Sequence, residues 1–308
     1  MGKQRIAYLR VIVTNDCPLH CTGCHQEGQT ICQQLPQEEL LRMVVACIDA
    51  GIRKVKLIGG EPTCYPDLLP LIRGIKTARS GIDLSMISNG LQSVAFYRDC
   101  LAQGLDRLNL SIHGWTADYF CRNTHATPAA WRTMRETLRA LLEAHAVCKL
   151  NYVWKRGENE ADLMQLIPAL AAFPDVRLDL LNFLVTSPGD VHRGFFLPME
   201  EIEAWLDAKF TIRTRVVHSN PYSLDSLDVT LGNGLHVNLK NRQLRDTQFL
   251  NACATCAQRP FCTEGITAVR LTTAGMLQPC LLRDDLSLDL LQTPQPDVME
   301  IQQYFSAL

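Results

Sequence analysis

The chain alternates short apolar runs with longer stretches of helical periodicity between residues 5 and 179. Runs of about four to eight β-branched or apolar residues are typical of buried strands. The predicted strands are residues 6–13, 54–58, 83–87, 107–112, 149–153 and 177–181, and the predicted helices include 37–50, 67–78, 129–145 and 160–172. Repeated strand–helix units build a parallel sheet, so the pattern predicts an α/β fold, a partial (β/α)6 TIM-type barrel open on one side.

The pattern changes after about residue 198. One further helix, 199–209, precedes short predicted strands at 212–217, 228–231 and 235–239, and Gly232-Asn233-Gly234 joins the last two as a hairpin. Residues 298–308 are predicted to form a terminal helix. We therefore expect two domains, a barrel over residues 1–211 and a small α+β extension over 212–308 that forms a layer closing the barrel mouth.

Composition argues against two classes of partner. The 308 residues are 47% hydrophobic and 20% charged, and the formal net charge of −2 suggests neither nucleic acid nor an anionic membrane as a partner. No apolar run approaches the roughly 20 residues of a membrane span, and the start, Met1-Gly2-Lys3-Gln4-Arg5, lacks a signal-peptide core. We expect a cytoplasmic protein.

Three cysteines, Cys17, Cys21 and Cys24, follow the first predicted strand at C-x3-C-x2-C spacing. Thiolates on one short loop can turn onto a soft metal centre, and three of them leave one coordination position for a substrate or cofactor. Zinc is the alternative, because His20 or His25 could supply a fourth ligand.

A second cysteine group has C-x2-C-x5-C-x17-C spacing: Cys253, Cys256, Cys262 and Cys280. Four thiolates are a complete ligand set for a second 4Fe-4S cluster or for zinc. In a reducing compartment, clustered cysteines among a total of 13 point to metal rather than to disulfides. The others stand singly and are expected to be small packing residues: Cys32, Cys47, Cys64, Cys100, Cys121 and Cys148.

Four further motifs end successive predicted strands: Gly59-Gly60-Glu61-Pro62, Ser88-Asn89-Gly90, Ser111-Ile112-His113 and Asn151-Tyr152-Val153. Together with the first cysteine loop, they resemble in order and position the motifs of radical S-adenosylmethionine (SAM) enzymes. Over most of its length the chain resembles the GTP-cyclising enzyme of molybdenum cofactor biosynthesis. The resemblance implies that Cys17, Cys21 and Cys24 hold a 4Fe-4S cluster whose open iron binds SAM, and that reduction of the cluster releases a 5'-deoxyadenosyl radical.

The same resemblance implies SAM contacts for residues at the strand ends: Gly59, Gly60, Glu61, Ser88, Asn89, Ser111 and Arg177. Glycine lets the backbone approach the amino group of SAM, and the Glu61 carboxylate accepts from that ammonium. Ser111 and Arg177 would bind the SAM carboxylate. A plain glycine turn and a solvated arginine at a strand end are the alternative interpretations.

One position departs from the family pattern. Many relatives have an aromatic residue just before the third cysteine, where it can cover the adenine, whereas this chain has Gly23. We expect the adenine contacts to come from elsewhere, for example from His25.

Basic residues correspond to positions that face the triphosphate in the GTP-cyclising enzyme: Arg10, Lys54, Lys56, Lys149 and Arg270. A buried cation is costly unless an anion meets it, so several in one barrel imply a phosphate or carboxylate ligand. For Lys54 and Lys56, strand capping or ion pairing is the alternative. Ala268 stands where the relative has arginine, which suggests a less charged substrate such as a monophosphate or carboxylate.

The C-terminal region resembles a divergent auxiliary-cluster domain of the twitch or SPASM type. Two family cysteines fall on Thr263 and Ile266 here, while three others, Cys253, Cys256 and Cys262, are added. The auxiliary 4Fe-4S cluster is expected to be fully ligated or to have one displaceable thiolate. These changes predict a relative that acts on another substrate.

We therefore predict a radical SAM enzyme that abstracts hydrogen from a nucleotide-like or small anionic substrate, leading to cyclisation or rearrangement. A flavodoxin- or ferredoxin-type protein would reduce it. Two enzymatic alternatives are GTP cyclisation itself and peptide modification, because C-x2-C-x5-C segments are frequent among peptide-modifying members. The basic residues suit phosphate better than peptide. A zinc-stabilised α/β binding protein is the non-enzymatic alternative.

Overall fold

The computed structural model describes residues 6, 8–28, 34–173, 175–187, 189–218, 225–240, 253–254, 256–257, 259, 262, 268–292 and 295–308. Six parallel strands are hydrogen-bonded in sequence order: β1 (Tyr8–Ile12), β2 (Lys54–Ile58), β3 (Asp83–Ser88), β4 (Arg107–Ser111), β5 (Val147–Val153) and β6 (Arg177–Leu181). This confirms the predicted partial barrel. Each predicted barrel strand overlaps an observed one, and its ends differ by at most two residues.

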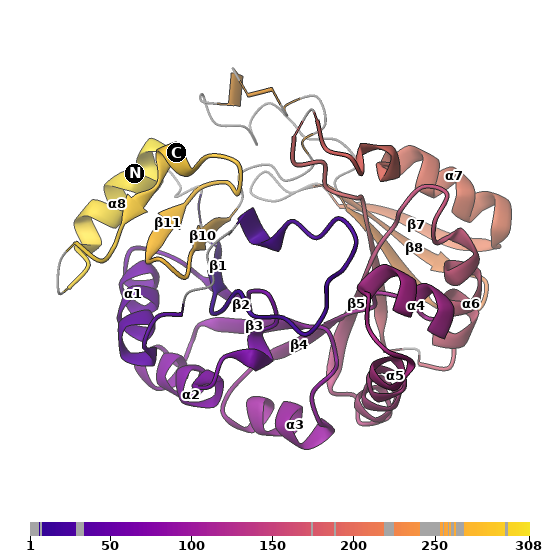
Figure 1. The fold of residues 1–308 in the computed structure, drawn as a ribbon, viewed down its shortest axis with the longest axis horizontal. Coiled ribbons are helices and arrows are strands. Elements are labelled where there is room, and N and C mark those ends of the chain that lie inside the picture. The colour runs from indigo at the N-terminus through magenta and orange to yellow at the C-terminus, as the bar shows by residue number, and fades with distance from the viewer. Residues whose placement is uncertain are drawn as a thin grey trace.

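Helices cover the convex face of the curved sheet, as Figure 1 shows: α1 (Gln37–Asp49), α2 (Leu68–Ala78), α3 (Val94–Ala102), α4 (Ala117–Thr124), α5 (Pro128–Glu143) and α6 (Glu160–Leu170). Their starts follow from the sequence. The hydroxyl groups of Ser93, Thr116 and Thr127 each accept a backbone N–H of the first turn, and Pro128 occupies the first position of α5. Helices α3 and α4 were not among the helices named from the sequence.

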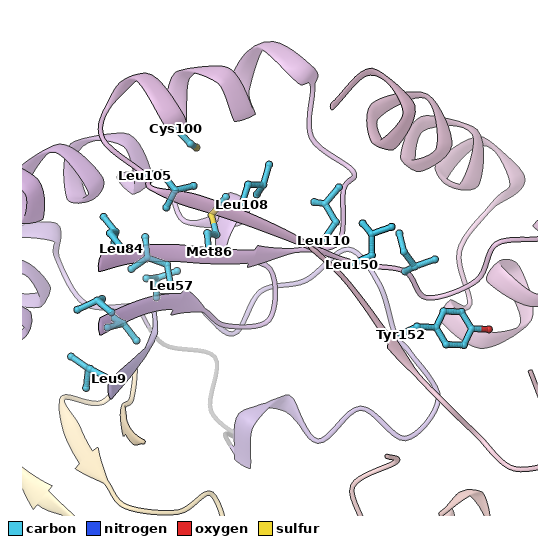
Figure 2. Packing of buried hydrophobic residues seen from close by; sticks show 14 of the residues in the cluster. Leu9, Leu57, Leu84, Met86, Cys100, Leu105, Leu108, Leu110, Leu150 and Tyr152 are labelled. Atoms are coloured by element: carbon cyan, nitrogen blue, oxygen red, sulfur yellow. The ribbon is translucent and has the colours of Figure 1, made fainter. Parts of the chain in front are cut away.

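The hydrophobic core lies between the sheet and these helices. Leu9, Leu57, Leu84, Leu108 and Leu150 come from five consecutive strands, and all are fully buried (Figure 2). Full burial of one leucine side chain contributes about 1.5–3 kcal/mol. The core therefore stabilises the curved sheet from outside the barrel.

The alternate strand positions are polar: Tyr8, Arg10, Lys54, Lys56, Asp83, Ser85, Arg107, Asn109, Lys149, Asn151, Arg177 and Asp179. Successive side chains of a strand point to opposite faces of the sheet, so these side chains point into the barrel. Closed TIM barrels fill that space with branched apolar residues. This polar interior is suited to hold a ligand.

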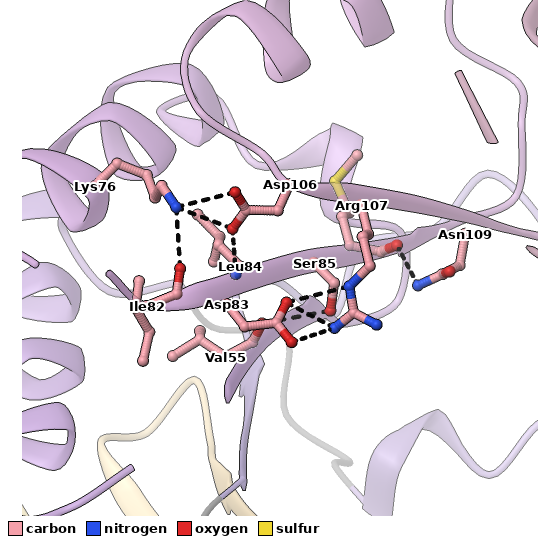
Figure 3. Close-up of polar contacts among 10 residues, drawn as sticks. Val55, Lys76, Ile82, Asp83, Leu84, Ser85, Asp106, Arg107 and Asn109 are labelled. Carbon is pink, nitrogen blue, oxygen red and sulfur yellow. Dashed lines mark hydrogen bonds and ion pairs between the residues drawn. The ribbon is translucent and has the colours of Figure 1, made fainter. Parts of the chain in front are cut away.

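Ion pairs close the barrel at the amino ends of β3 and β4 (Figure 3). Arg107 Nη2 lies 2.7 Å from both carboxylate oxygens of Asp83. Next to them, Lys76 Nζ from α2 donates to Asp106 Oδ2 at 2.9 Å and to the Ile82 carbonyl at 3.0 Å. These four charged side chains are therefore paired with one another at this end of the barrel.

The C-terminal part extends the same sheet at both edges. Its strands are β7 (Ile212–His218), β8 (Ser226–Leu231), β9 (His236–Lys240), β10 (Val269–Leu271), β11 (Met276–Gln278) and β12 (Leu288–Asp289). The strand order is β12-β11-β10-β1-β2-β3-β4-β5-β6-β9-β8-β7, with β10 parallel to β1 and β9 parallel to β6. These strands continue the barrel sheet, where the sequence suggested a separate layer. The domain boundary at residue 211 stays a prediction.

The remaining helices are α7 (Met199–Lys209), α8 (Val298–Ala307) and the short 3-10 turns η1 (Gln26–Gly28), η2 (Pro62–Cys64), η3 (Arg193–Phe195) and η7 (Asp284–Leu286). Helix α8 packs against α1, and the segment after β1, in indigo, crosses the concave side of the sheet (Figure 1). The predicted β8–β9 hairpin is confirmed. With at most 16 residues each, the helices in the described part of the chain could not traverse a bilayer.

Candidate active site

A cavity of about 730 Å³ lies inside the barrel and reaches the carboxyl ends of its strands. It brings together most of the predicted site residues: Arg10, Cys17, Cys21, Cys24, Lys56, Gly59, Gly60, Glu61, Ser88, Asn89, Ser111, Lys149, Arg177 and Arg270. Lys54, at the amino end of β2, does not line this cavity. Neither do Cys253, Cys256, Cys262 and Cys280.

The first cysteine loop, residues 17–24, is fixed to the barrel by buried hydrogen bonds. Thr22 N donates to the Asn123 carbonyl at 2.7 Å. Lys155 Nζ donates at 2.6 Å both to the Thr22 carbonyl and to Asn123 Oδ1. Lys155 is only 5% exposed, and sequence reasoning missed it, although it lies two residues after the β5 end motif. It is therefore a positioning residue for the loop.

Replacing Lys155 with Met should lower the free energy of unfolding by about 2–4 kcal/mol, because the Thr22 carbonyl and Asn123 Oδ1 lose a buried donor. Urea unfolding of the metal-free protein measures this. Arg156→Met is the matched control, because Arg156 pairs with Glu201 at the surface, and it should change stability by less than about 1 kcal/mol. Equal stability of both variants would refute the anchoring role.

The three thiols of the loop share one electrostatic environment. Burial raises the pKa of Cys17 to about 12, and the negative charges of Glu61 and the other two thiols add to this rise. Burial also raises the pKa of Cys21 to about 11, partly offset by Lys155. No three described His, Cys, Asp or Glu side chains are already gathered into a metal-binding group. Thiols with raised pKa values ionise only beside a positive charge. The three thiols therefore fit a metal cluster, whose binding would draw them together.

Gly59 and Gly60 allow the turn after β2 to pack on the start of the cysteine loop. Gly60 N donates to the Thr14 carbonyl at 2.8 Å. A Cβ atom on Gly59 would lie 2.3 Å from Thr14 O, and one on Gly60 would lie 2.4 Å from Asn15 O. Because these contacts are far below van der Waals distance, only glycine fits at either position.

The Glu61 carboxylate joins the ends of β2 and β3. It is 2% exposed, and its Oε1 accepts from Thr63 Oγ1 at 2.8 Å and from Ser88 Oγ at 2.7 Å. Its Oε2 accepts from Asn89 N at 2.7 Å. Burial raises the pKa of Glu61, while these hydrogen bonds oppose the rise. Oε2 is therefore the oxygen with capacity for one more donor.

Buried amide atoms that lack a partner face the same cavity. Among the described residues, Asn89 Nδ2, Asn182 Oδ1 and Asn238 Oδ1 make no hydrogen bond, and all three residues line the cavity. An unpaired buried amide costs about 1–3 kcal/mol, so natural proteins usually satisfy it with a ligand or water. These atoms, together with Ser111, fit a polar ligand.

A first group of cations lies on β10, β1 and β2. Arg270, Arg10 and Lys56 are direct neighbours across the three strands. Glu27 of η1 accepts from Arg10 Nη2 at 2.6 Å and from Arg270 Nε at 3.2 Å. Lys56 Nζ lies 5.2 Å from the ring centroid of Tyr8. Burial lowers the pKa of Lys56 well below its usual value, and Lys149, Arg10 and Lys240 lower it further.

A second group of cations surrounds Asp179, whose side chain is fully buried. Lys149 Nζ lies 2.8 Å and Lys240 Nζ 2.9 Å from Asp179 Oδ2, and Arg177 Nε lies 2.8 Å from Oδ1. Burial and Lys240 lower the pKa of Lys149 to about 8. Sequence reasoning missed Glu27, Asp179 and Lys240. The alternating polar positions of β6 and β9 were the available signal for the last two.

Phe183 occupies the space beside Gly23. Gly23 stands at the position where the family pattern has an aromatic residue. Gly23 has a φ of +71°, and a Cβ atom there would lie 2.6 Å from the Phe183 ring. Phe195 packs edge-on against Phe183, with ring centroids 5.5 Å apart. His25 also lines the cavity, but its Nδ1 accepts from Glu27 N at 3.1 Å. The aromatic surface next to the third cysteine therefore comes from the end of β6.

Comparisons with known proteins agree with this geometry. A family model of the radical SAM superfamily matches residues 11–168. The probable GTP 3',8-cyclase of Thermococcus kodakarensis is 29% identical over 93% of this chain and 88% of that protein. The GTP 3',8-cyclase of Desulforamulus reducens is 32% identical over 90% of this chain and 82% of that protein.

The fold is also that of solved structures. Streptococcus suis SuiB bound to S-adenosylmethionine superimposes with a TM-score of 0.62 at 14% identity, over 96% of this chain and 64% of SuiB. At that identity the likeness shows the shared α/β architecture. The family model covers the cysteine loop and the strand-end motifs that meet in the cavity. The chain therefore belongs to the radical SAM superfamily and is a relative of the GTP 3',8-cyclases.

Proposed function

We propose that this radical SAM enzyme acts on a small anionic, nucleotide-like substrate whose phosphate is bound by the two cation groups inside the barrel. One observation carries the proposal: among the described residues, six basic side chains line one cavity, and five of them pair with one of two carboxylates, those of Glu27 and Asp179. The six are Arg10, Lys56, Lys149, Arg177, Lys240 and Arg270. A buried cation is costly unless an anion meets it, so an anionic ligand would be stabilised among these side chains.

The residues at the carboxyl ends of the strands would hold the cofactors. Cys17, Cys21 and Cys24 would ligate a 4Fe-4S cluster. Glu61 Oε2 and Asn89 Nδ2 would meet the polar groups of SAM, with Ser111 beside them. When bound, cluster and SAM together supply reductive cleavage of SAM and abstraction of a hydrogen atom from the substrate.

The sequence predicts that Arg177 binds the SAM carboxylate, but the contacts of Arg177 in the structure indicate a different role. Its Nε is paired with Asp179, and its side chain is 40% exposed toward the cavity. We therefore assign it to the cation group that surrounds Asp179, from which its guanidinium nitrogens can still reach a carboxylate or a phosphate.

We further propose that Cys253, Cys256, Cys262 and Cys280 ligate a second 4Fe-4S cluster in an auxiliary domain over residues 212–308. Two observations support this ligand set. Leu282 N donates to Cys280 Sγ at 3.5 Å, and the charge of Arg283 interacts with Cys253 and Cys256. Amide donors and cations stabilise sulfur that carries negative charge. A flavodoxin- or ferredoxin-type protein would deliver the electrons.

The test of the proposed substrate class is an anaerobic assay of the reconstituted, reduced enzyme with SAM. Addition of GTP, or of a nucleoside monophosphate, should raise the rate of 5'-deoxyadenosine formation above the uncoupled rate. The added nucleotide should be consumed. Guanosine, which lacks the phosphate, should have little effect. If guanosine and GTP act equally, the anion site has no role in substrate binding. If neither acts but an uncharged peptide does, the enzyme is peptide-modifying.

Nucleotide binding should depend on the protonation of Lys149. Because its pKa is about 8, the affinity for GTP should fall by about tenfold as pH rises from about 7 to 9. Lys149→Arg should keep its affinity over that range, because arginine stays charged. Isothermal titration calorimetry of both proteins measures the difference. Parallel pH profiles would show that Lys149 does not contact the nucleotide's charge.

A further inference from the structure

We infer that Glu27 is an internal competitor for the substrate's anionic group: its carboxylate occupies the place between Arg10 and Arg270 that a phosphate would take. This rests on the proposed function of the cavity. The two oxygens of Glu27 are divided between the arginines, Oε1 at 2.6 Å from Arg10 Nη2 and Oε2 at 3.2 Å from Arg270 Nε. A carboxylate that joins two guanidinium groups imitates the way in which phosphate oxygens bind them.

The position of Glu27 is set by a loop, whereas the arginines are set by the sheet. Arg10 and Arg270 are register partners of parallel strands β1 and β10, so their spacing is fixed without Glu27. Glu27 is 8% exposed and lines the cavity between them. Removing its charge should therefore strengthen the attraction of these two prearranged arginines for a ligand anion.

The backbone at Glu27 is in a strained conformation. Gln26 and Glu27 have φ angles of +47° and +52°, a left-handed conformation that disfavours side chains by about 1–2 kcal/mol per residue. The ion pairs with Arg10 and Arg270 hold this conformation. They also keep Glu27 ionised, since both guanidinium groups lower its pKa to about 2 against the opposing effect of burial. A stronger anion that displaces the carboxylate would relax the loop.

Displacement of Glu27 would also move the segment next to the cysteine loop. Glu27 lies three residues after Cys24, and its backbone N–H donates to His25 Nδ1 at 3.1 Å. A substrate anion that moves Glu27 would thus move the segment adjoining the third cysteine. The charge of the substrate and the position of this loop would be coupled.

The experiment measures pyrophosphate binding by calorimetry to the reconstituted full-length chain and to two variants. Glu27→Gln keeps the size of the side chain and removes its charge, and it should bind pyrophosphate about tenfold more tightly than the wild type. Glu201→Gln is the matched control, because Glu201 pairs with Arg156 on the surface, and it should bind like the wild type.

Each outcome of this experiment either supports or overturns the inference. Tighter binding by Glu27→Gln alone supports the inference. Unchanged binding shows that Glu27 does not compete, and weaker binding shows that it orients the arginines for the ligand instead; either result overturns the inference while leaving the proposed substrate class intact. Absence of pyrophosphate and GTP binding in all three proteins would sink the proposed function, and the inference with it. Thermal unfolding of Glu27→Gln verifies that the variant is folded.

Discussion

Replacement of Cys21 with alanine is expected to abolish 5'-deoxyadenosine formation. Among the described cysteines, Cys17, Cys21 and Cys24 line the cavity, and loss of one would remove a third of the proposed protein ligands for the SAM-binding cluster. We expect the rate to fall by at least about a thousandfold, a barrier increase of about 4 kcal/mol. Chromatography of SAM and 5'-deoxyadenosine after anaerobic reconstitution and reduction measures the loss.

Cys121→Ala is the matched control for this substitution. Cys121 is a half-buried cysteine of α4 that does not line the cavity, so its loss should leave SAM cleavage near the wild-type rate. Wild-type activity of reconstituted Cys21→Ala would refute the ligand assignment. Iron analysis adds a second readout: a variant with all three loop cysteines replaced should retain about four irons if the C-terminal thiols bind their own cluster.

Replacement of Gly60 with alanine is expected to destabilise the protein strongly. The new Cβ atom would stand 2.4 Å from Asn15 O and 2.5 Å from Asp16 O, and backbone atoms cannot rotate away as a side chain can. We expect a loss of at least about 3 kcal/mol in the free energy of unfolding, because overpacking against backbone forces two segments apart. Urea unfolding of the metal-free protein measures it.

Gly81→Ala provides the comparison, because a Cβ atom at Gly81 would meet nothing within 4 Å. That variant should be as stable as the wild type or slightly more stable. If Gly60→Ala is equally stable, the turn after β2 can move away from the cysteine loop, and the close contact is not needed for folding.

Much of the barrel could be predicted because its strands have a strict inside and outside. The apolar positions of β1 to β6 pack under helices, and polar positions between them, such as Arg10, Lys56 and Lys149, line the cavity, so periodicity indicates which face of the sheet a side chain occupies. The same reasoning is wrong for Lys54. This residue alternates with Lys56 along β2 and so belongs to the same face of the sheet, but it lies at the amino end of the strand, away from the cavity. The alternation of side chains along a strand predicts the face of the sheet on which each one lies. Whether a residue on the inner face reaches the cavity depends on where helices and loops close the barrel.

Other parts of the site could not be predicted, because they depend on contacts between distant segments. Glu27 is an unremarkable loop residue in the sequence, and only the pairing of β10 with β1 brings Arg270 to it. Strand β10 has three residues and β12 has two, too few to show any periodicity. Lys240 reaches Asp179 only because β9 adds to the edge of β6.

The two edges of the barrel sheet have a consequence for folding during synthesis. Strand β1 is made well before its partner β10, which follows about 260 residues later, and β6 is made before its partner β9. Until then the backbone groups along both edges can pair with any other strand, which makes a nascent barrel prone to aggregation. Docking of the late strands protects these edges and delivers Arg270 and Lys240 to the cavity in the same step. An incompletely folded chain thus has neither protected edges nor a full anion site.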